Sequence, residues 1–199
     1  MIRLQIANVY KLNDMKVNLA VRMIIALCSI CASSVARVNT LEKGAILNLE
    51  IAGKGTLSIQ LNQTKAPATT AHIIKLAQSG FYNGQKIFKV VRQPRPFAIY
   101  FGDPLTKTKS IDDASIGSGG SGAKVAYENT GITHRAGAVG LSHKPGDQNS
   151  GDCQFYVCLG DYGFLDGQYT VFGQVTKDSM PLLDKIERGD VVSQATITD

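Results

Sequence analysis

Residues 154–175 have the sequence QFYVCLGDYGFLDGQYTVFGQV, and this stretch decides how the chain folds. It is typical of a strand, a tight loop and a second strand, with aromatic residues at Phe155, Phe164 and Tyr169. It contains neither a nucleophile paired with a base nor a set of metal ligands. A site built from it would therefore hold an apolar group by shape and add a few hydrogen bonds.

The composition is that of an ordinary globular domain. The chain has 199 residues, of which 44% are hydrophobic and 19% charged, and this predicts one domain with an appendage. The net charge of +5 is mild, and the basic residues form no run of five or more. Because aromatic residues are not interleaved with basic ones as on a stacking platform, we expect no nucleic-acid partner.

The N-terminal region has the pattern of a secretory signal. Basic residues follow Met15, residues 23–33 are mostly apolar, and residues 34–36 fit a small-x-small cleavage site. We therefore expect residues 1–36 to be a signal peptide with an upstream leader, with Met15 as a candidate start, and residues 37–43 to be a linker. The protein would be exported, either periplasmic or secreted. The alternative is a buried core helix in a cytoplasmic protein. The apolar run is too short for a stable membrane span.

The four cysteines do not predict a disulfide framework. Cys28 and Cys31 lie inside the apolar N-terminal run, with no second cysteine pair or histidine nearby. Cys153 and Cys158 flank a predicted strand. At about 3.3 Å per residue their side chains point to opposite faces and lie too far apart to bond. We expect the thiols after residue 43 to be free and structural.

Short strands dominate the rest of the chain. We expect strands at 45–51, 56–61, 87–91, 97–101, 137–142, 155–159, 170–175 and 191–197. One helix should follow Pro67, with Thr69 or Thr70 as its N-cap, and end at Gly80, and a second should cover residues 180–187. Residues 103–133 have little periodicity, and their glycine-rich part lacks the lysine of a phosphate-binding loop. This pattern favours an antiparallel barrel closed by helices.

Several ordered motifs resemble those of one family. They are residues 66–74 (APATTAHII), 80–84 (GFYNG), 101–103 (FGD), 117–120 (GSGG), 128–129 with 134–142, 154–157 (QFYV), 164–167 (FLDG) and 171–175 (VFGQV). In this order and spacing they resemble the cyclophilin peptidyl-prolyl isomerases, from about residue 44 to 198. The resemblance implies a mainly β fold, an eight-stranded antiparallel β-barrel capped by two α-helices, in a domain of residues 44–199.

The resemblance also implies site residues. Lys89 stands where the family has its catalytic arginine, and the substrate-binding positions are Phe97, Ala98, Tyr100, Gln154, Phe155, Phe164, Leu165 and Tyr169. Ala98 replaces a methionine, Tyr100 a glutamine and Tyr169 a histidine, while Phe164 stands where many members have tryptophan. Phe97, Phe155 and Leu165 would contact the proline ring; Tyr156 is either a pocket residue or a core residue. Gln154 would hold a substrate carbonyl or satisfy the strand edge.

The expected reaction is rotation about an X–Pro bond, which assists protein folding. The barrier is about 18–20 kcal/mol because the C–N bond is partly double. Three features would help: an apolar pocket for the ring, donors that hold the substrate backbone, and a donor aimed at the prolyl nitrogen, each where it binds the twisted state better than the ground state. The resemblance thus implies an isomerase that acts, as a monomer, on Pro-containing segments of client proteins, without a metal or other cofactor. The alternative is a proline-peptide binding or chaperone module with weak or no turnover, and a more distant one is a scaffold.

Three other features carry open interpretations. Lys89 would place positive charge near the prolyl bond with poorer geometry than arginine, so we expect reduced activity. Arg92 and Arg95 either reach into the pocket or are solvated loop charges. Ser142-His143 is a poor nucleophile pair, because neighbouring strand residues face opposite ways and no acid is placed to orient the histidine. His72, His134 and His143 lack metal-ligand spacing.

Overall fold

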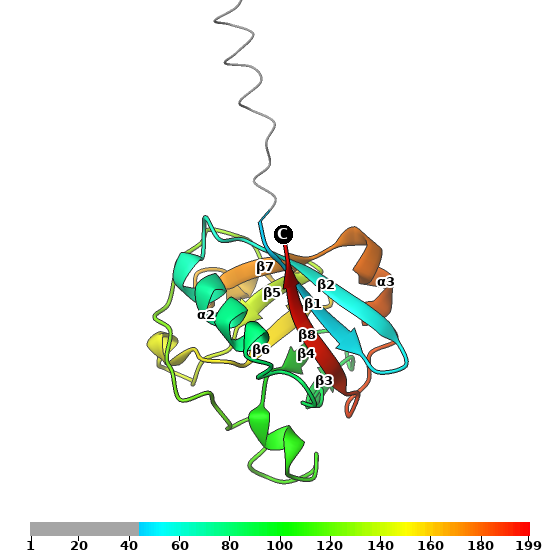
Figure 1. The fold of residues 1–199 in the computed structure, drawn as a ribbon. Helices are drawn as coiled ribbons and strands as arrows, with labels where there is room; N and C mark the ends of the chain where they lie inside the picture. The colour runs from blue at the N-terminus through cyan, green and yellow to red at the C-terminus, as the bar shows by residue number, and fades with distance from the viewer. Residues whose placement is uncertain (1–43) are drawn as a thin grey trace, which may run out of the picture. The chain divides into compact units, whose positions relative to one another are not determined.

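The sheet is the frame of the molecule. The computed structural model describes residues 44–199, which form an eight-stranded antiparallel sheet in the order β3-β4-β6-β5-β7-β2-β1-β8 (Figure 1). The strands are β1 (Ile46–Ile51), β2 (Gly55–Leu61), β3 (Lys89–Val91), β4 (Ala98–Phe101), β5 (Ala138–Leu141), β6 (Phe155–Cys158), β7 (Val171–Val175) and β8 (Val192–Thr198). Each strand lies inside or within one residue of a predicted one. The predictions for residues 1–36 and 37–43 lie outside the described residues.

The two ends of the sheet meet just before β3 and β8. Lys86 forms an antiparallel bridge with Val191. The amide of Ile87 donates to the carbonyl of Asp190 at 2.8 Å, and the amide of Val192 donates to the carbonyl of Gln85 at 2.9 Å. These bonds curl the sheet on itself, and the predicted eight-stranded antiparallel barrel is confirmed.

The central strands bury side chains on both faces. In β6, Phe155 and Val157 point into the main core, whereas Tyr156 and Cys158 belong to a second apolar cluster on the outer face. The second cluster also contains Ala98 from the neighbouring strand β4. Because side chains alternate along a strand, this arrangement follows from the register of β6. The outer cluster supports the candidate site.

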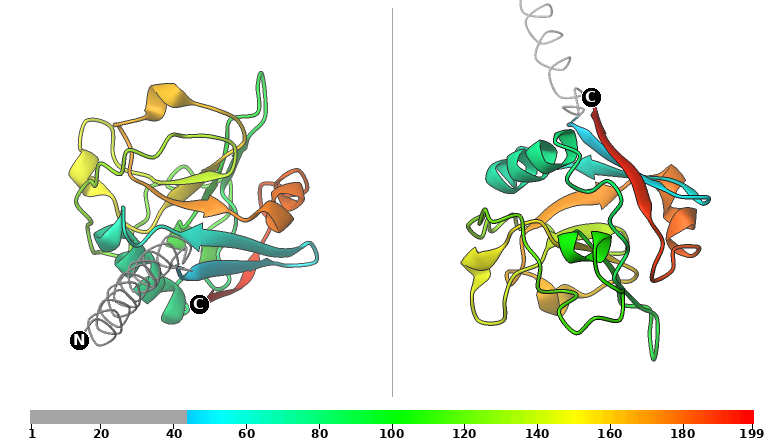
Figure 2. Two further views of the ribbon diagram at one scale, coloured as in Figure 1. Left: turned by 90° about the horizontal axis from the view of Figure 1, so that it is seen from above. Right: turned by 60° about the horizontal axis from the view of Figure 1, so that its bottom comes forward.

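Two α-helices in the described part of the chain lie on opposite sides of the domain, and both pack against the main core (Figures 1 and 2). Helix α2 (Pro67–Gln78) contacts β8, and helix α3 (Met180–Leu183) contacts β2. The end of α2 before Gly80, which has φ +71°, is as predicted. The second helix is shorter than the predicted 180–187, because after Leu183 the chain forms a tighter turn in which Lys185 N donates to Leu182 O. None of the described helices is long and apolar enough to cross a membrane.

Helix α2 is capped by a residue distant in sequence. The prediction of Thr69 or Thr70 as N-cap is wrong, since the N-cap position is Ala66, which offers no side-chain acceptor. Instead the carboxylate of Glu128 accepts from the amides of Ala68 at 2.9 Å and Thr69 at 2.8 Å, and from the Thr69 hydroxyl at 2.6 Å. A negative charge here also complements the helix dipole.

Both cysteines of the described range are buried free thiols, as predicted. Cys153 precedes β6 and Cys158 ends it. Burial raises the pKa of each thiol from 9.0 to about 12.

Candidate active site

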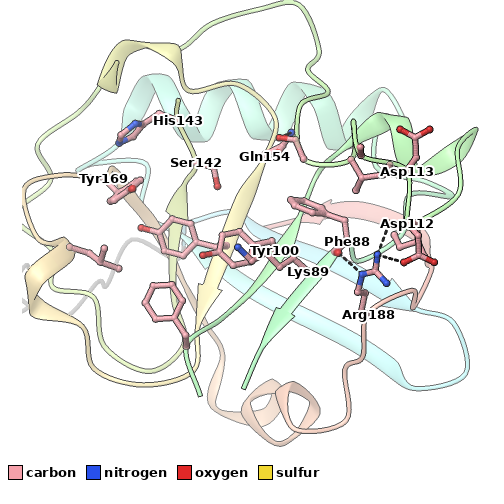
Figure 3. A pocket seen from close by; sticks show the side chains of 17 residues that line it. Phe88, Lys89, Tyr100, Asp112, Asp113, Ser142, His143, Gln154, Tyr169 and Arg188 are labelled. Atoms are coloured by element: carbon pink, nitrogen blue, oxygen red, sulfur yellow. Dashed lines mark hydrogen bonds and ion pairs between the residues drawn. The ribbon is translucent and has the colours of Figure 1, made fainter. Parts of the chain in front are cut away.

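A groove of about 630 Å³ lies on the outer face of the barrel, over β4 and β6 (Figure 3). Its lining consists of Phe88, Lys89, Phe97, Tyr100, Ile111, Asp112, Asp113, Ala114, Ile116, Gly117, Ser142, His143, Gln154, Tyr156, Leu165, Tyr169 and Arg188. Six of the predicted site residues are in it: Lys89, Phe97, Tyr100, Gln154, Leu165 and Tyr169. The groove thus brings together residues from segments more than 80 positions apart.

Three predicted site residues lie elsewhere. Phe155 is fully buried in the barrel core, where its ring stacks on Phe101 with centroids 5.2 Å apart. Its proposed place on the groove wall is taken by Tyr156, because the even-numbered residues of β6 face outward. Ala98 is buried in the cluster beneath the lining. Phe164 is 64% exposed and stacks beside Phe97 at the rim, with centroids 6.4 Å apart.

Lys89 extends over an aromatic ring. It is paired with Tyr100 across β3 and β4, and its Nζ lies 4.9 Å from the centre of the Tyr100 ring. This is a cation–π distance. Within residues 44–199 the ammonium forms no ion pair, so its charge is available to the groove. Burial raises the pKa of Tyr100, which keeps its hydroxyl protonated at neutral pH.

Gln154 holds the glycine-rich loop beside the groove. Its side-chain amide donates to the carbonyls of Gly117 at 3.1 Å and Gly119 at 2.7 Å. Both amide hydrogens are therefore committed to the loop, and the oxygen remains to accept a hydrogen bond. This differs from the predicted role as a donor to a substrate carbonyl. The glycine at position 119 also lets the loop pack closely against Asp103, because a Cβ there would lie 2.2 Å from the Asp103 carboxylate.

Ser142 and His143 are groove residues that the sequence did not reveal as such. The His143 ring stacks on Tyr169 with centroids 4.3 Å apart (Figure 3). The Ser142 hydroxyl is buried and has no hydrogen-bond partner among the described residues. The His143 ring nitrogens bond to the carbonyls of Lys144 and Gln168 and not to Ser142, which agrees with the expectation of a poor nucleophile pair.

The segment after β4 extends the groove. Ile111, Asp112, Asp113 and Ile116 form its far end, in the stretch expected to be a surface loop. Arg188 fastens this stretch: its guanidinium donates to the carbonyls of Ile111 at 2.5 Å and Phe88 at 3.1 Å and pairs with Asp112 at 2.7 Å (Figure 3). The groove therefore has a second, more charged end.

The loop arginines do not enter the groove. The Arg92 guanidinium donates to the carbonyls of Leu183 at 2.7 Å and Ile186 at 2.9 Å, at the end of α3. Arg95 is exposed and is absent from the lining. Arg92 is thus a structural residue, and Lys89 and Arg188 supply the positive charge of the groove.

A buried polar chain underlies the lining. The Nδ1 of His134 lies 2.7 Å from the Asp166 carboxylate, and its Nε2 lies 2.9 Å from the Tyr156 hydroxyl. Asp166 also accepts from the backbone amide of His134 at 2.8 Å. In the sequence, His134 stands in the motif of residues 134–142, and nothing there indicates its bonds to Asp166 and Tyr156. Residues 44–199 contain no group of three or more His, Cys, Asp or Glu side chains able to hold a metal ion.

Comparison with known proteins identifies a family. The model of the cyclophilin-type peptidyl-prolyl cis-trans isomerases matches residues 46–199. A Synechococcus elongatus peptidyl-prolyl cis-trans isomerase is 33% identical over 157 residues, covering 78% of this chain and 97% of the relative. A Helicobacter pylori one is 30% identical over 148 residues, covering 73% of this chain and 82% of the relative.

Solved structures support the same fold. A Cryptosporidium parvum cyclophilin-type isomerase, crystallised in the presence of the dipeptide Ala-Pro, superimposes with a TM-score of 0.64 at 19% identity. The match covers 77% of this chain and 99% of that one. A cyclophilin from Hirschia baltica gives a TM-score of 0.60 at 20% identity, covering 76% of this chain and 73% of that one. At these identities the likeness establishes the architecture.

Proposed function

The chain belongs to the cyclophilin-type peptidyl-prolyl cis-trans isomerases, and from this premise we propose that its groove uses Lys89 as the main electrostatic residue. The activity itself is that of the family: rotation about an X–Pro peptide bond. The proposal concerns how this groove, with its altered lining, performs that rotation. The observation that carries it is the position of the Lys89 ammonium over the Tyr100 ring, in the groove that Phe97 also lines and without an ion pair in the described range.

The groove offers an apolar seat for the proline ring. Phe97, Tyr156 and Leu165 supply apolar lining next to each other in the outer cluster. In the Cryptosporidium neighbour crystals were grown with Ala-Pro, and we infer that the same kind of dipeptide unit occupies this part of the groove. A ring held there fixes one side of the bond, so that the other side can turn.

Lys89 acts on the turning bond. Rotation removes the amide resonance, so the carbonyl and the nitrogen change their charge as the bond twists. A cation close to the bond lowers the barrier only where it interacts more strongly with the twisted form than with the planar one. An ammonium is a flexible point charge and lacks the planar fork of a guanidinium. The Tyr100 ring offsets part of this disadvantage by restricting where the ammonium lies.

Peptide backbone contacts come from the neighbouring wall. The Oε1 atom of Gln154 accepts from a substrate amide. The substrates are Pro-containing segments of client proteins, and the enzyme acts as a monomer. No metal or organic group is needed for this chemistry. Export, which rests on residues 15–36, is part of the proposal and predicts a processed protein outside the cytoplasm.

The test measures exchange between cis and trans Ala-Pro peptide by NMR. Lys89→Ala should lower kcat/KM at least about tenfold, which corresponds to about 1.4 kcal/mol of lost transition-state stabilisation. Lys89→Arg should retain or raise it. Lys75→Ala, which removes an exposed lysine from helix α2, is the matched control and should have no effect. Full activity of Lys89→Ala would show that the ammonium is not the electrostatic residue.

A binding module is the second candidate function. The observation that favours it is the aromatic ring of Tyr100 between Phe88 and Tyr156, with centroids 6.1 and 5.8 Å away, which narrows the groove where the family has a glutamine. Such a groove would grip a proline segment without favouring its twisted form. Saturable binding of the Ala-Pro peptide without accelerated exchange would establish this function.

A further inference from the structure

The polar chain below the groove joins two separate parts of its lining. Tyr156 comes from strand β6, and Leu165 from the 3-10 turn Gly163–Leu165. Asp166 directly follows Leu165, and its carboxylate is connected through the His134 imidazole to the Tyr156 hydroxyl. The imidazole is completely buried, whereas the Asp166 carboxylate is 34% exposed. The positions of Tyr156 and Leu165 are therefore coupled by two hydrogen bonds.

The proton positions in this series of hydrogen bonds depend on its two end residues, Asp166 and Tyr156. Two hydrogen bonds from His134, one from its ring and one from its backbone amide, lower the pKa of Asp166, so this end is a carboxylate that accepts. Burial raises the pKa of Tyr156 well above its usual value, so this end is a hydroxyl that donates. In the neutral imidazole the proton on Nδ1 is donated to the Asp166 carboxylate, and Nε2 accepts from the Tyr156 hydroxyl. Each bond has a donor and an acceptor.

Strand β5 leaves space for this arrangement. A Cβ at Gly140 would lie 2.4 Å from the Cζ and 2.5 Å from the hydroxyl oxygen of Tyr156. The Tyr169 ring packs edge-on against the Tyr156 ring with centroids 5.6 Å apart. The tyrosine is thus confined on its sides by Gly140 and Tyr169 and held at its tip by His134.

We propose that His134 and Asp166 are positioning residues that set the width of the proline pocket by holding Tyr156 at a fixed distance from Leu165. The inference rests on the proposed function, since it takes this part of the groove as the seat of the proline ring. Neither residue touches the substrate. Their role is to keep the two apolar walls at the separation that a five-membered ring requires.

The hydrogen-bonded residues Asp166, His134 and Tyr156, here called the strut, would control which ring size of the substrate residue the pocket prefers. In a pocket with fixed walls, one methylene more or less changes kcat/KM about 10- to 200-fold. The wild-type enzyme should therefore prefer a prolyl peptide to its six-membered homologue, a pipecolyl peptide. If the hydrogen bonds of the strut are removed, Tyr156 can move away from Leu165, and the preference for the prolyl peptide over the pipecolyl peptide becomes smaller. A residue that served stability alone would leave this ratio unchanged.

The experiment compares the two peptides in the full chain. For wild type, Tyr156→Phe, His134→Gln and the double variant, the ratio of kcat/KM for the prolyl over the pipecolyl peptide is measured by NMR exchange, and the ratio of dissociation constants by titration. Tyr82→Phe is the matched control, because it removes another buried tyrosine hydroxyl, whose 3.1 Å bond to the Cys153 carbonyl lies in the core. Tyr156→Phe retains the ring, so the variant keeps its apolar packing.

We expect Tyr156→Phe and His134→Gln each to lower the ratio about fivefold, the factor that one net hydrogen bond represents. The double variant should show no further loss, because both changes break the same strut. An unchanged ratio in folded Tyr156→Phe, or an equal loss in Tyr82→Phe, would overturn the inference. If the wild type binds the prolyl peptide without accelerating its exchange, the proposed function fails while the ratio of dissociation constants still decides the strut.

Discussion

Replacing Gly140 by alanine tests how closely strand β5 approaches the pocket wall. The new Cβ would lie 2.4 Å from Cζ of Tyr156, whereas ordinary contacts are 3.4–4 Å, so the ring or the strand must shift by about 1 Å. The ring is 4% exposed and hydrogen-bonded at its tip, and it has little freedom to move away. Overpacking of this kind costs about 1–3 kcal/mol of folding free energy. Urea denaturation at constant m-value would measure this loss.

A double-mutant cycle assigns the loss to the tyrosine. In a Tyr156→Leu background there is no Cζ or hydroxyl for the methyl group to meet, so Gly140→Ala should then cost close to nothing. The coupling free energy between the two changes should be about 1–3 kcal/mol. Gly163→Ala is the control, because its nearest contact would be an ordinary 3.8 Å, and it should change stability by less than about 0.5 kcal/mol. An equal cost of Gly140→Ala in both backgrounds would refute the steric reasoning.

Two further predictions concern carboxylates. Glu128→Gln keeps an oxygen acceptor at the start of helix α2 but removes the charge, so it should lower stability by about 1 kcal/mol and the melting temperature by about 2–4 °C; an unchanged thermal midpoint would contradict this. The hydrogen bonds from His134 lower the pKa of Asp166 in the folded protein. The ionised Asp166 therefore stabilises the fold fully above its unfolded-state pKa of about 4, and this stabilisation is lost as the pH falls through its lower folded-state pKa. The stability difference between wild type and Asp166→Asn, measured by urea denaturation, should thus shrink below about pH 4, and a constant difference from pH 3 to 7 would count against it.

Strand β6 shows what a motif can and cannot predict. The order of short segments was sufficient for the barrel, because it reflects the succession of strands and turns. It did not determine which face of β6 forms the groove, since all four residues of the strand are buried and no alternation between apolar and polar residues remains. Phe155 and Tyr156 are both aromatic, and only the register of β6 with β4 and β5 determines that Phe155 lies in the core and Tyr156 on the groove wall.

The other unforeseen features depend on contacts between distant residues. Glu128 caps a helix that begins about 60 positions earlier, and Arg188 fastens a loop whose Ile111 carbonyl lies 77 positions away. Neither contact leaves a local pattern in the sequence. His134 gave a partial signal, since it stands in a recognised motif, but its bond to Tyr156 requires the fold. The lining from Ile111 to Ile116 has no periodicity that would mark it as a wall.

Burial of Cys153 and Cys158 suppresses thiol–disulfide exchange between the folded domain and its surroundings. Thiol–disulfide exchange proceeds through the thiolate. Because burial raises the pKa of Cys153 and Cys158 to about 12, the thiolate form of either residue is rare at neutral pH. Oxidised glutathione and oxidoreductases therefore find almost no reactive sulfur on the folded barrel. Burial of both thiols therefore protects the folded barrel from forming mixed disulfides with other proteins.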